Sequence, residues 1–94
     1  MKREEKLQLL AEGLLDGARV IMMKKPQIKK VMVSRNHLQD LIRQTLRYTD
    51  THTINNWIRV LIVEGLISEH SKQSYKRPHP LSRYTINMDE CELN

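Results

Sequence analysis

The sequence predicts a mainly α-helical domain with a small β-hairpin, an α+β fold, and three observations predict it. Apolar residues recur at helical spacing in three segments, which cover residues 2 to about 22, 35–47 and 51–64. Two shorter segments, residues 66–70 and 81–87, have the composition and the alternation of strands. Residues 71–80 between them are polar and contain two prolines, which exclude a helix and are typical of a hairpin loop.

The length and composition indicate one domain with a modest core. Ninety-four residues can bury a single small core but not a second one. The chain has one Trp and no Phe, so we expect a core of Leu, Ile, Val and Met. We expect the domain to occupy residues 1–87 and to be followed by an acidic, poorly ordered C-terminal tail, residues 88–94.

The net charge of +5 lies in two basic blocks, residues 1–33 and 71–83. Such blocks favour an acidic polymer or an acidic surface as the partner. The longest apolar run, residues 20–23, is too short to cross a bilayer, and the N-terminus lacks the hydrophobic block of a signal peptide. The single cysteine, Cys91, cannot form an internal disulfide. We therefore expect a cytoplasmic protein without a membrane partner.

The first predicted helix, residues 2 to about 22, is interrupted by Gly13 and Gly17. Each glycine costs about 1 kcal/mol relative to alanine in a helix interior, so either the helix breaks there or close packing against another backbone compensates. We favour one helix. Leu9 and Val20 lie off its core face, and they form either a dimer contact or singly exposed apolar side chains, which are common.

A short edge strand is expected over residues 28–33, after Pro26 ends the first helix. Ser34 is a suitable N-cap for the second helix, which ends near Arg47. Only about three residues then precede the third helix. Two short helices with so short a connection indicate a helix-turn-helix arrangement.

The third predicted helix, residues 51–64, has a clear start and stop. Asp50 is its expected N-cap, and Gly65 is expected to end it in the left-handed conformation. The stripe that faces inward contains Ile54, Trp57, Ile58, Leu61 and Ile62.

The opposite side of this helix has a different character, because it carries His52, Asn55, Asn56 and Arg59 and no acidic residue. Asn can form two hydrogen bonds with adenine, and Arg can form two with guanine. The alternative is an ordinary solvated helix face, and the stripe alone does not decide between the two.

The segment T-I-N-N-W-I-R-V-L-I-V-E-G-L-I, residues 53–67, resembles the recognition helix of the winged helix-turn-helix domains of bacterial and archaeal transcription regulators, running into their first wing strand. The order helix, strand, helix, helix, strand, basic loop, strand is also similar to that family over about residues 2–87. The resemblance implies sequence-specific binding of double-stranded DNA and a role in transcription regulation. The third helix would lie in the major groove, and the basic wing, residues 71–80, on the DNA backbone or in the minor groove.

The resemblance also implies roles for individual residues, which follow from their positions in the pattern. Base reading falls on His52, Asn55, Asn56 and Arg59. Wing contacts fall on Lys72, Tyr75, Lys76 and Arg77, with His79 as a further candidate, and the phosphate contact at the start of the second helix falls on Ser34, Arg35 and Asn36. Val60 and Val63 depart from a purely polar outward face, and they either touch a thymine methyl group or indicate a helix covered by another protein.

Two other functional classes stay open: a winged-helix module that binds protein, and a nonspecific nucleic-acid binder. A single module covers little DNA, so we expect a homodimer on half-sites about one helical turn apart. Its interface would use Leu9 and Val20 of the first helix, the C-terminal tail, or both. The sequence does not indicate a small effector.

Enzymatic chemistry is not expected. The sequence has no nucleophile elbow, no phosphate-binding glycine loop and no paired carboxylates in a plausible pocket. The four histidines, His37, His52, His70 and His79, lack metal-site spacing. The remaining metal hypothesis is a meeting of His70 and His79 across the hairpin. Cys91 has no basic neighbour to activate it. We predict neither a metal nor a cofactor.

Overall fold

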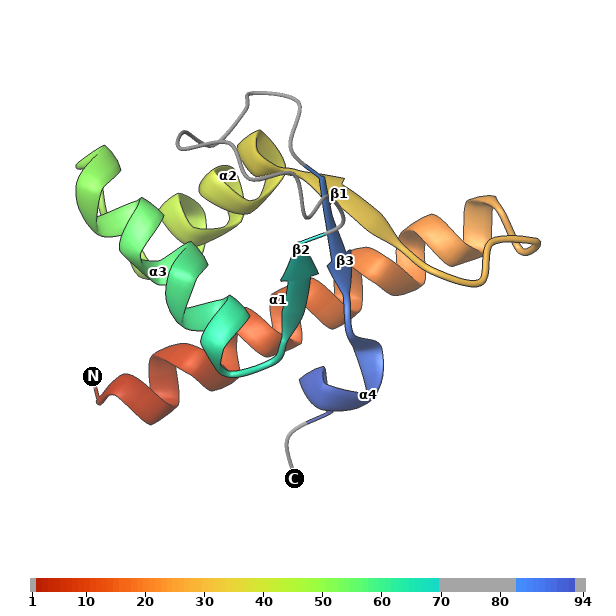
Figure 1. Ribbon diagram of the computed structural model, residues 1–94, viewed down its shortest axis with the longest axis horizontal. Helices are drawn as coiled ribbons and strands as arrows, with labels where there is room; N and C mark the ends of the chain where they lie inside the picture. The colour runs from red at the N-terminus through yellow and green to blue at the C-terminus, as the bar shows by residue number, and fades with distance from the viewer. Residues whose placement is uncertain (1, 70–82, 93–94) are drawn as a thin grey trace.

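The computed structural model describes residues 2–69 and 83–92, in which helices pack with a small antiparallel sheet (Figure 1). The elements in chain order are α1 (Arg3–Lys24), β1 (Met32–Ser34), α2 (Arg35–Leu46), α3 (Thr51–Val63), β2 (Ile67–Glu69), β3 (Arg83–Ile86) and α4 (Met88–Cys91). The coarse fold class predicted from the sequence, helices with a small antiparallel sheet, is confirmed.

The strands form one antiparallel sheet in the order β1-β3-β2. Val33 of β1 lies opposite Tyr84 of the central strand, and Ile67 of β2 lies opposite Ile86. Tyr84 and Ile86 of β3 are buried, whereas Arg83 is exposed and Thr85 is partly exposed. The predicted alternation along this strand is therefore confirmed.

The core is apolar, and every element contributes to it. Leu, Ile and Val fill it as expected, but no methionine among the described residues is buried, whereas Ala, Tyr84 and Cys91 are. Among the described residues no polar or charged residue is buried. α1 runs along the longest axis of the molecule, α2 and α3 lie together on one side of it, and α4 lies close to it beside the sheet (Figure 1). The largest fully buried side chains are Leu10, Leu14, Val31, Leu38, Ile42, Ile54, Ile58, Leu61 and Ile67.

Local signals place the boundaries of α2 and α3. The Ser34 hydroxyl accepts a hydrogen bond from the His37 amide at 3.2 Å, and the Asp50 carboxylate accepts one from the Thr53 amide at 2.8 Å. Both predicted N-caps are thus confirmed. α3 ends at Val63. Gly65, two residues later, has a left-handed φ of 79°, and the Leu66 amide donates to the Leu61 carbonyl at 3.0 Å. This is the hydrogen-bond pattern of a Schellman motif.

α1 is one continuous helix, as the sequence analysis favoured, and Gly13 shows one reason. A methyl group built on Gly13 would lie 2.8 Å from Leu41 Cδ1, so a side chain of α2 occupies the space that the glycine leaves. The compensating contact is therefore with a side chain and not with a backbone. Gly17 has nothing within 4 Å of such a methyl group.

The strand expected over residues 28–33 is shorter and starts later than predicted, because β1 spans only Met32–Ser34. The Ile28 amide donates to the Lys25 carbonyl at 3.1 Å, which closes a turn around Pro26. This turn uses the residues that were expected to begin the strand. Val31 and Val33 are buried, as expected of inward positions.

The expectation of a poorly ordered segment after residue 87 is wrong for residues 88–92. Met88–Cys91 form α4, and Cys91 is 2% exposed. Its thiol donates to the Leu66 carbonyl at 3.6 Å, and the side-chain amide of Asn87 donates through Nδ2 to the Gly65 carbonyl at 2.7 Å. Burial, followed by the nearby Glu90 carboxylate, raises the pKa of Cys91 to about 11. The apolar contacts of one cysteine thus outweigh the acidic composition around it.

Among the described residues, no helix combines the length and apolar character needed to span a bilayer.

Candidate nucleic-acid interface

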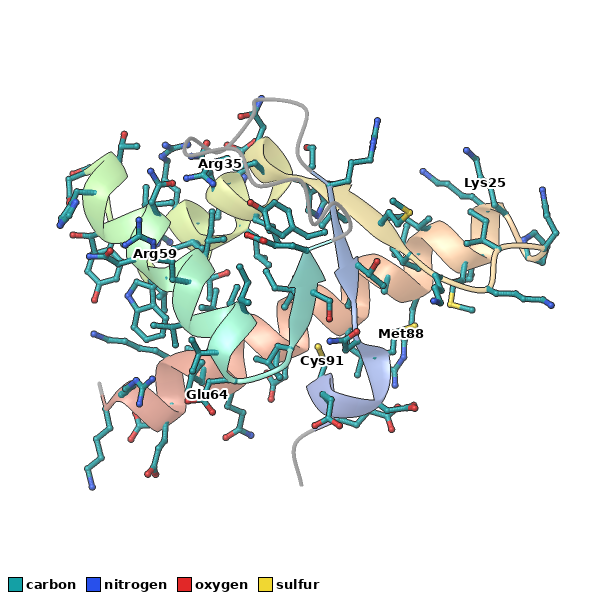
Figure 2. The ribbon with its side chains drawn as sticks, viewed as in Figure 1. Lys25, Arg35, Arg59, Glu64, Met88 and Cys91 are labelled. Atoms are coloured by element: carbon teal, nitrogen blue, oxygen red, sulfur yellow. The ribbon has the colours of Figure 1, made fainter. Side chains whose placement is uncertain are left out.

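α3 separates a buried face from an exposed one, and this separation creates the candidate site. Ile54, Ile58 and Leu61 are buried, while His52 and Arg59 on the opposite side are exposed. Trp57, expected on the buried stripe, is only partly buried at its edge. The side chain of Arg59 extends from the outer side of α3 (Figure 2). Three of the four predicted base-reading residues, His52, Asn56 and Arg59, are exposed.

The fourth predicted base reader, Asn55, lies between α2 and α3 and is partly buried. The Gln39 amide of α2 donates to its Oδ1 at 3.0 Å. This bond ties the two helices together and uses one side of the Asn55 amide. Sequence analysis did not single out Gln39. Its position next to the buried Leu38 on α2 is the signal that could have pointed to a contact between the helices.

His52 and Asn56 are one helical turn apart and their side chains meet. Asn56 Nδ2 lies 3.4 Å from His52 Nε2. Asn56 is exposed, and its amide has a second hydrogen and an oxygen besides the hydrogen that can face His52, so it can offer a donor and an acceptor side by side. This is the combination that pairs with adenine in the major groove.

The N-terminal end of α2 contains the three residues predicted to contact phosphate. Ser34 uses its hydroxyl as the helix cap, and Asn36 is exposed. Arg35 Nη1 donates to the hydroxyl of Tyr84 at 3.3 Å, so the guanidinium group is tied to the central strand. The guanidinium group has four further N–H donors, and the helix end adds free backbone amides. The arrangement can therefore bind an anion.

A cluster of Lys6, Tyr48 and Trp57 fixes the connection between α2 and α3 to α1. Lys6 Nζ donates to the Tyr48 hydroxyl at 2.8 Å and lies 5.4 Å and 6.0 Å from the ring centres of Tyr48 and Trp57. The hydrogen bond from Lys6 lowers the pKa of Tyr48. These are cation–π contacts, and they link α1 to Tyr48 before α3 and to Trp57 within it. Sequence analysis missed this cluster because its members are far apart in the chain.

Several predicted positions lie outside the described residues. They are the wing residues Lys72, Tyr75, Lys76 and Arg77, together with His70 and His79. Within residues 2–69 and 83–92 there is no group of three His, Cys, Asp or Glu residues that could hold a metal ion. The hypothesis of a metal between His70 and His79 is outside this range.

No protein-family model, no curated protein and no solved structure matches the chain. Functional inference therefore rests on the chemistry of the exposed groups. The outer face of α3 offers hydrogen-bond donors and one guanidinium group, and its helix contains no acidic residue. These groups can donate hydrogen bonds and can contact a negatively charged partner.

Proposed function

We propose that the chain is a winged helix-turn-helix domain that binds double-stranded DNA sequence-specifically, as a transcription regulator. The observation that carries this proposal is the exposed outer face of α3, with Arg59, Asn56 and His52 and no carboxylate along the helix. A duplex presents phosphates on both sides of the major groove, so an acid-free helix enters it without charge repulsion.

The order of elements supports the same proposal. α2 and α3 are joined by residues 47–50 only, and the sheet order β1-β3-β2 brings the ends of β2 and β3 together beside α2. Residues 70–82, which connect β2 and β3, contain the basic block that the resemblance assigns to the wing, Lys72, Tyr75, Lys76 and Arg77. Their role as phosphate contacts is part of the proposal and follows from sequence alone.

Within the groove, Arg59 and Asn56 are the proposed base readers. Arg59 can donate two hydrogen bonds to guanine, and Asn56 can pair with adenine through its amide. His52 positions Asn56 through their contact at 3.4 Å. Asn55 has one side of its amide engaged by Gln39, so it contacts a base with the remaining side and also fixes α3 on α2.

We further propose that two copies act together on a palindromic site. The outer face of α1 exposes apolar side chains, with Leu9 at 37%, Val20 at 51% and Met23 at 81%. A two-fold pairing of these faces would bury them and double the DNA contacted. The C-terminal segment is the second candidate surface, and its described part is docked beside α1, with Arg19 and Glu92 3.6 Å apart.

A protein-binding module is the competing function, and Val63 is the observation that favours it. This side chain is 80% exposed at the end of α3. Val60, three residues before Val63 and on the same side of α3, is partly exposed. A protein partner would cover both valines, whereas a duplex would use at most a thymine methyl group against one of them.

Selection from a pool of randomised duplexes tests the proposal. We expect enrichment of a short motif, and a symmetric motif if two copies bind together. Binding without enrichment identifies a nonspecific nucleic-acid binder. Absence of duplex binding at low salt would remove the DNA-binding proposal and leave the protein-binding module.

A further inference from the structure

Residues 24–30, here the lysine loop, form a second basic surface remote from α3. The loop contains Lys24, Lys25, Lys29 and Lys30, and all four are exposed. No acidic residue occurs between residues 17 and 39, and none of the four lysines forms an ion pair in the part of the chain that the structure describes. The positive charge of this loop is therefore not neutralised from within.

The backbone of the lysine loop is fixed at both ends and in its middle. The Lys25 amide donates to the Ile21 carbonyl at 3.0 Å, and the Lys25 carbonyl accepts from Ile28 at 3.1 Å. Pro26 restricts the turn between these bonds, and the buried Val31 anchors the chain that follows. The two lysine pairs thus extend from an anchored turn, which lowers the entropy lost on binding.

The position of the loop relates it to the proposed DNA site. α3, the start of α2 and the lysine loop follow one another along the longest axis of the molecule (Figure 1). Arg35 lies between Arg59 and Lys25 along this axis, and both Arg35 and Lys25 are toward the same edge of the molecule (Figure 2). The whole molecule extends 36 Å in its longest direction, so the lysine loop lies within about one helical turn of DNA, about 34–36 Å, of α3.

We infer that the lysine loop binds the phosphate backbone of the same duplex, within about one helical turn of the bases that α3 reads. This inference rests on the proposed DNA-binding function. Gln27 supplies the one side-chain amide of the loop, but four of its seven residues are lysines, and ammonium groups suit phosphates. Its contribution is therefore independent of sequence. It extends the bound length of DNA beyond the reach of α3.

The closing experiment measures binding to two duplexes that carry the motif enriched by wild-type protein. One extends about one helical turn, roughly 10 base pairs, beyond the motif on each side, and the other contains the motif alone. The test variant is Lys29→Gln with Lys30→Gln. The matched control is Lys2→Gln with Arg19→Gln, which removes the same charge from exposed residues. Arg19 lies beside the C-terminal segment, 3.6 Å from Glu92, and Lys2 precedes α1.

The inference predicts that the test variant weakens binding of the long duplex by up to about 60-fold at 0.1 M salt, and lowers the salt slope by about 1.8 for two lost phosphate contacts. Binding of the short duplex stays as in wild type. The control changes little with either duplex, because charges more than about 10 Å from the DNA are screened at this salt concentration.

Equal weakening by the test and control variants, or no weakening by either, would overturn the inference while leaving sequence selection by wild type intact. Failure of wild type to bind any duplex would instead refute the proposed function. Vesicles of anionic phospholipid serve as a third arm. If the test variant loses vesicle binding but keeps wild-type binding of the long duplex, the loop binds a membrane surface and not DNA.

Discussion

The outer faces of α3 and α1 are both exposed, yet they differ in charge and in chemistry. α3 presents His52, Asn56 and Arg59 without an acidic residue. α1 presents Glu12 and Asp16 among apolar side chains. The first face suits a polyanion, and the second would repel one. Exposure therefore does not identify a partner, whereas the sign of the charge around the exposed groups limits the choice.

The inner faces of the same two helices are alike. Leu10, Leu14 and Ala18 of α1 and Ile54 and Ile58 of α3 are all buried in one core. Burial of apolar area stabilises both helices in the same way. The functional difference thus lies only in the outer residues, which can be replaced without disturbing the core. Substitutions of these outer residues can therefore test the proposed difference between α1 and α3.

The largest expected effect is that of Arg59→Ala on base preference. Loss of a bidentate contact to guanine costs about 1–3 kcal/mol, so the preference for the selected motif over a duplex with that base changed should fall about 5- to 150-fold. The measurement is competition binding with single-base variants of the motif. Arg43→Ala is the control, because Arg43 is exposed on α2 and makes the same change in charge.

The alternative result is equally informative. If Arg43→Ala and Arg59→Ala lower the affinity for all duplexes alike, the outer face of α3 contributes charge and not base reading. The difference between the two helix faces would then reduce to electrostatics.

The next effect concerns self-association through α1. Leu9→Ser with Val20→Ser should raise the dimer dissociation constant by tenfold or more, since each copy loses burial worth about 0.8 kcal/mol per CH₂ group. Equilibrium sedimentation over a range of concentrations measures this. Val63→Ser is the matched control, because Val63 is the strongly exposed valine on α3.

The opposite result would be a dimer that dissociates with Val63→Ser but keeps the wild-type dissociation constant with the α1 variant. α3 would then be the protein-binding face, and the competing function would be favoured. A wild-type protein that is monomeric at all concentrations would remove the dimer proposal alone.

The sequence predicts the helices well where the signals are local. Ser34, Asp50 and Gly65 act within four residues of themselves, through caps and a left-handed stop, and each was predicted from its immediate neighbours. The division of α3 into a buried and an exposed face follows likewise from helical periodicity. The residues on the exposed face of α3 could therefore largely be predicted from the sequence.

The contacts that fix this surface in place were not predictable in the same way. Lys6 and Tyr48 are 42 residues apart, and Arg35 and Tyr84 are 49 apart. Long side chains with several rotamers reach such partners only after the core has set the helix positions. Gln39 at Asn55 and the docking of Cys91 have the same origin, because each depends on the tertiary fold.

A smaller effect is expected for substitutions of the two glycines of α1, and it depends on the space around each glycine. Gly17→Ala should raise the free energy of unfolding by about 0.5–1 kcal/mol, since the added methyl group meets nothing within 4 Å. Gly13→Ala should gain less, because Leu41 must move away from a contact at 2.8 Å. Urea unfolding at low protein concentration measures both. A loss of stability with Gly17→Ala would indicate a close partner at this point of α1.

The smallest effect is the pH dependence of the start of α3. Hydrogen bonds from the side chain and then the backbone of Thr53 lower the pKa of Asp50 below its usual 3.8. A lowered pKa in the folded state stabilises the protein above the unfolded value, and this stabilisation is lost as the pH falls through the folded pKa. Asp50→Ala should therefore be less stable than wild type above about pH 5, and the difference should narrow below pH 3.8. Asp40→Ala is the control, since its exposed pair with Arg43 contributes little. Thermal melts across this range measure the difference. If the difference in stability between wild type and Asp50→Ala stays constant with pH, Asp50 acts through packing and not as a charged cap. Packing of the core alone would then determine where α3 begins.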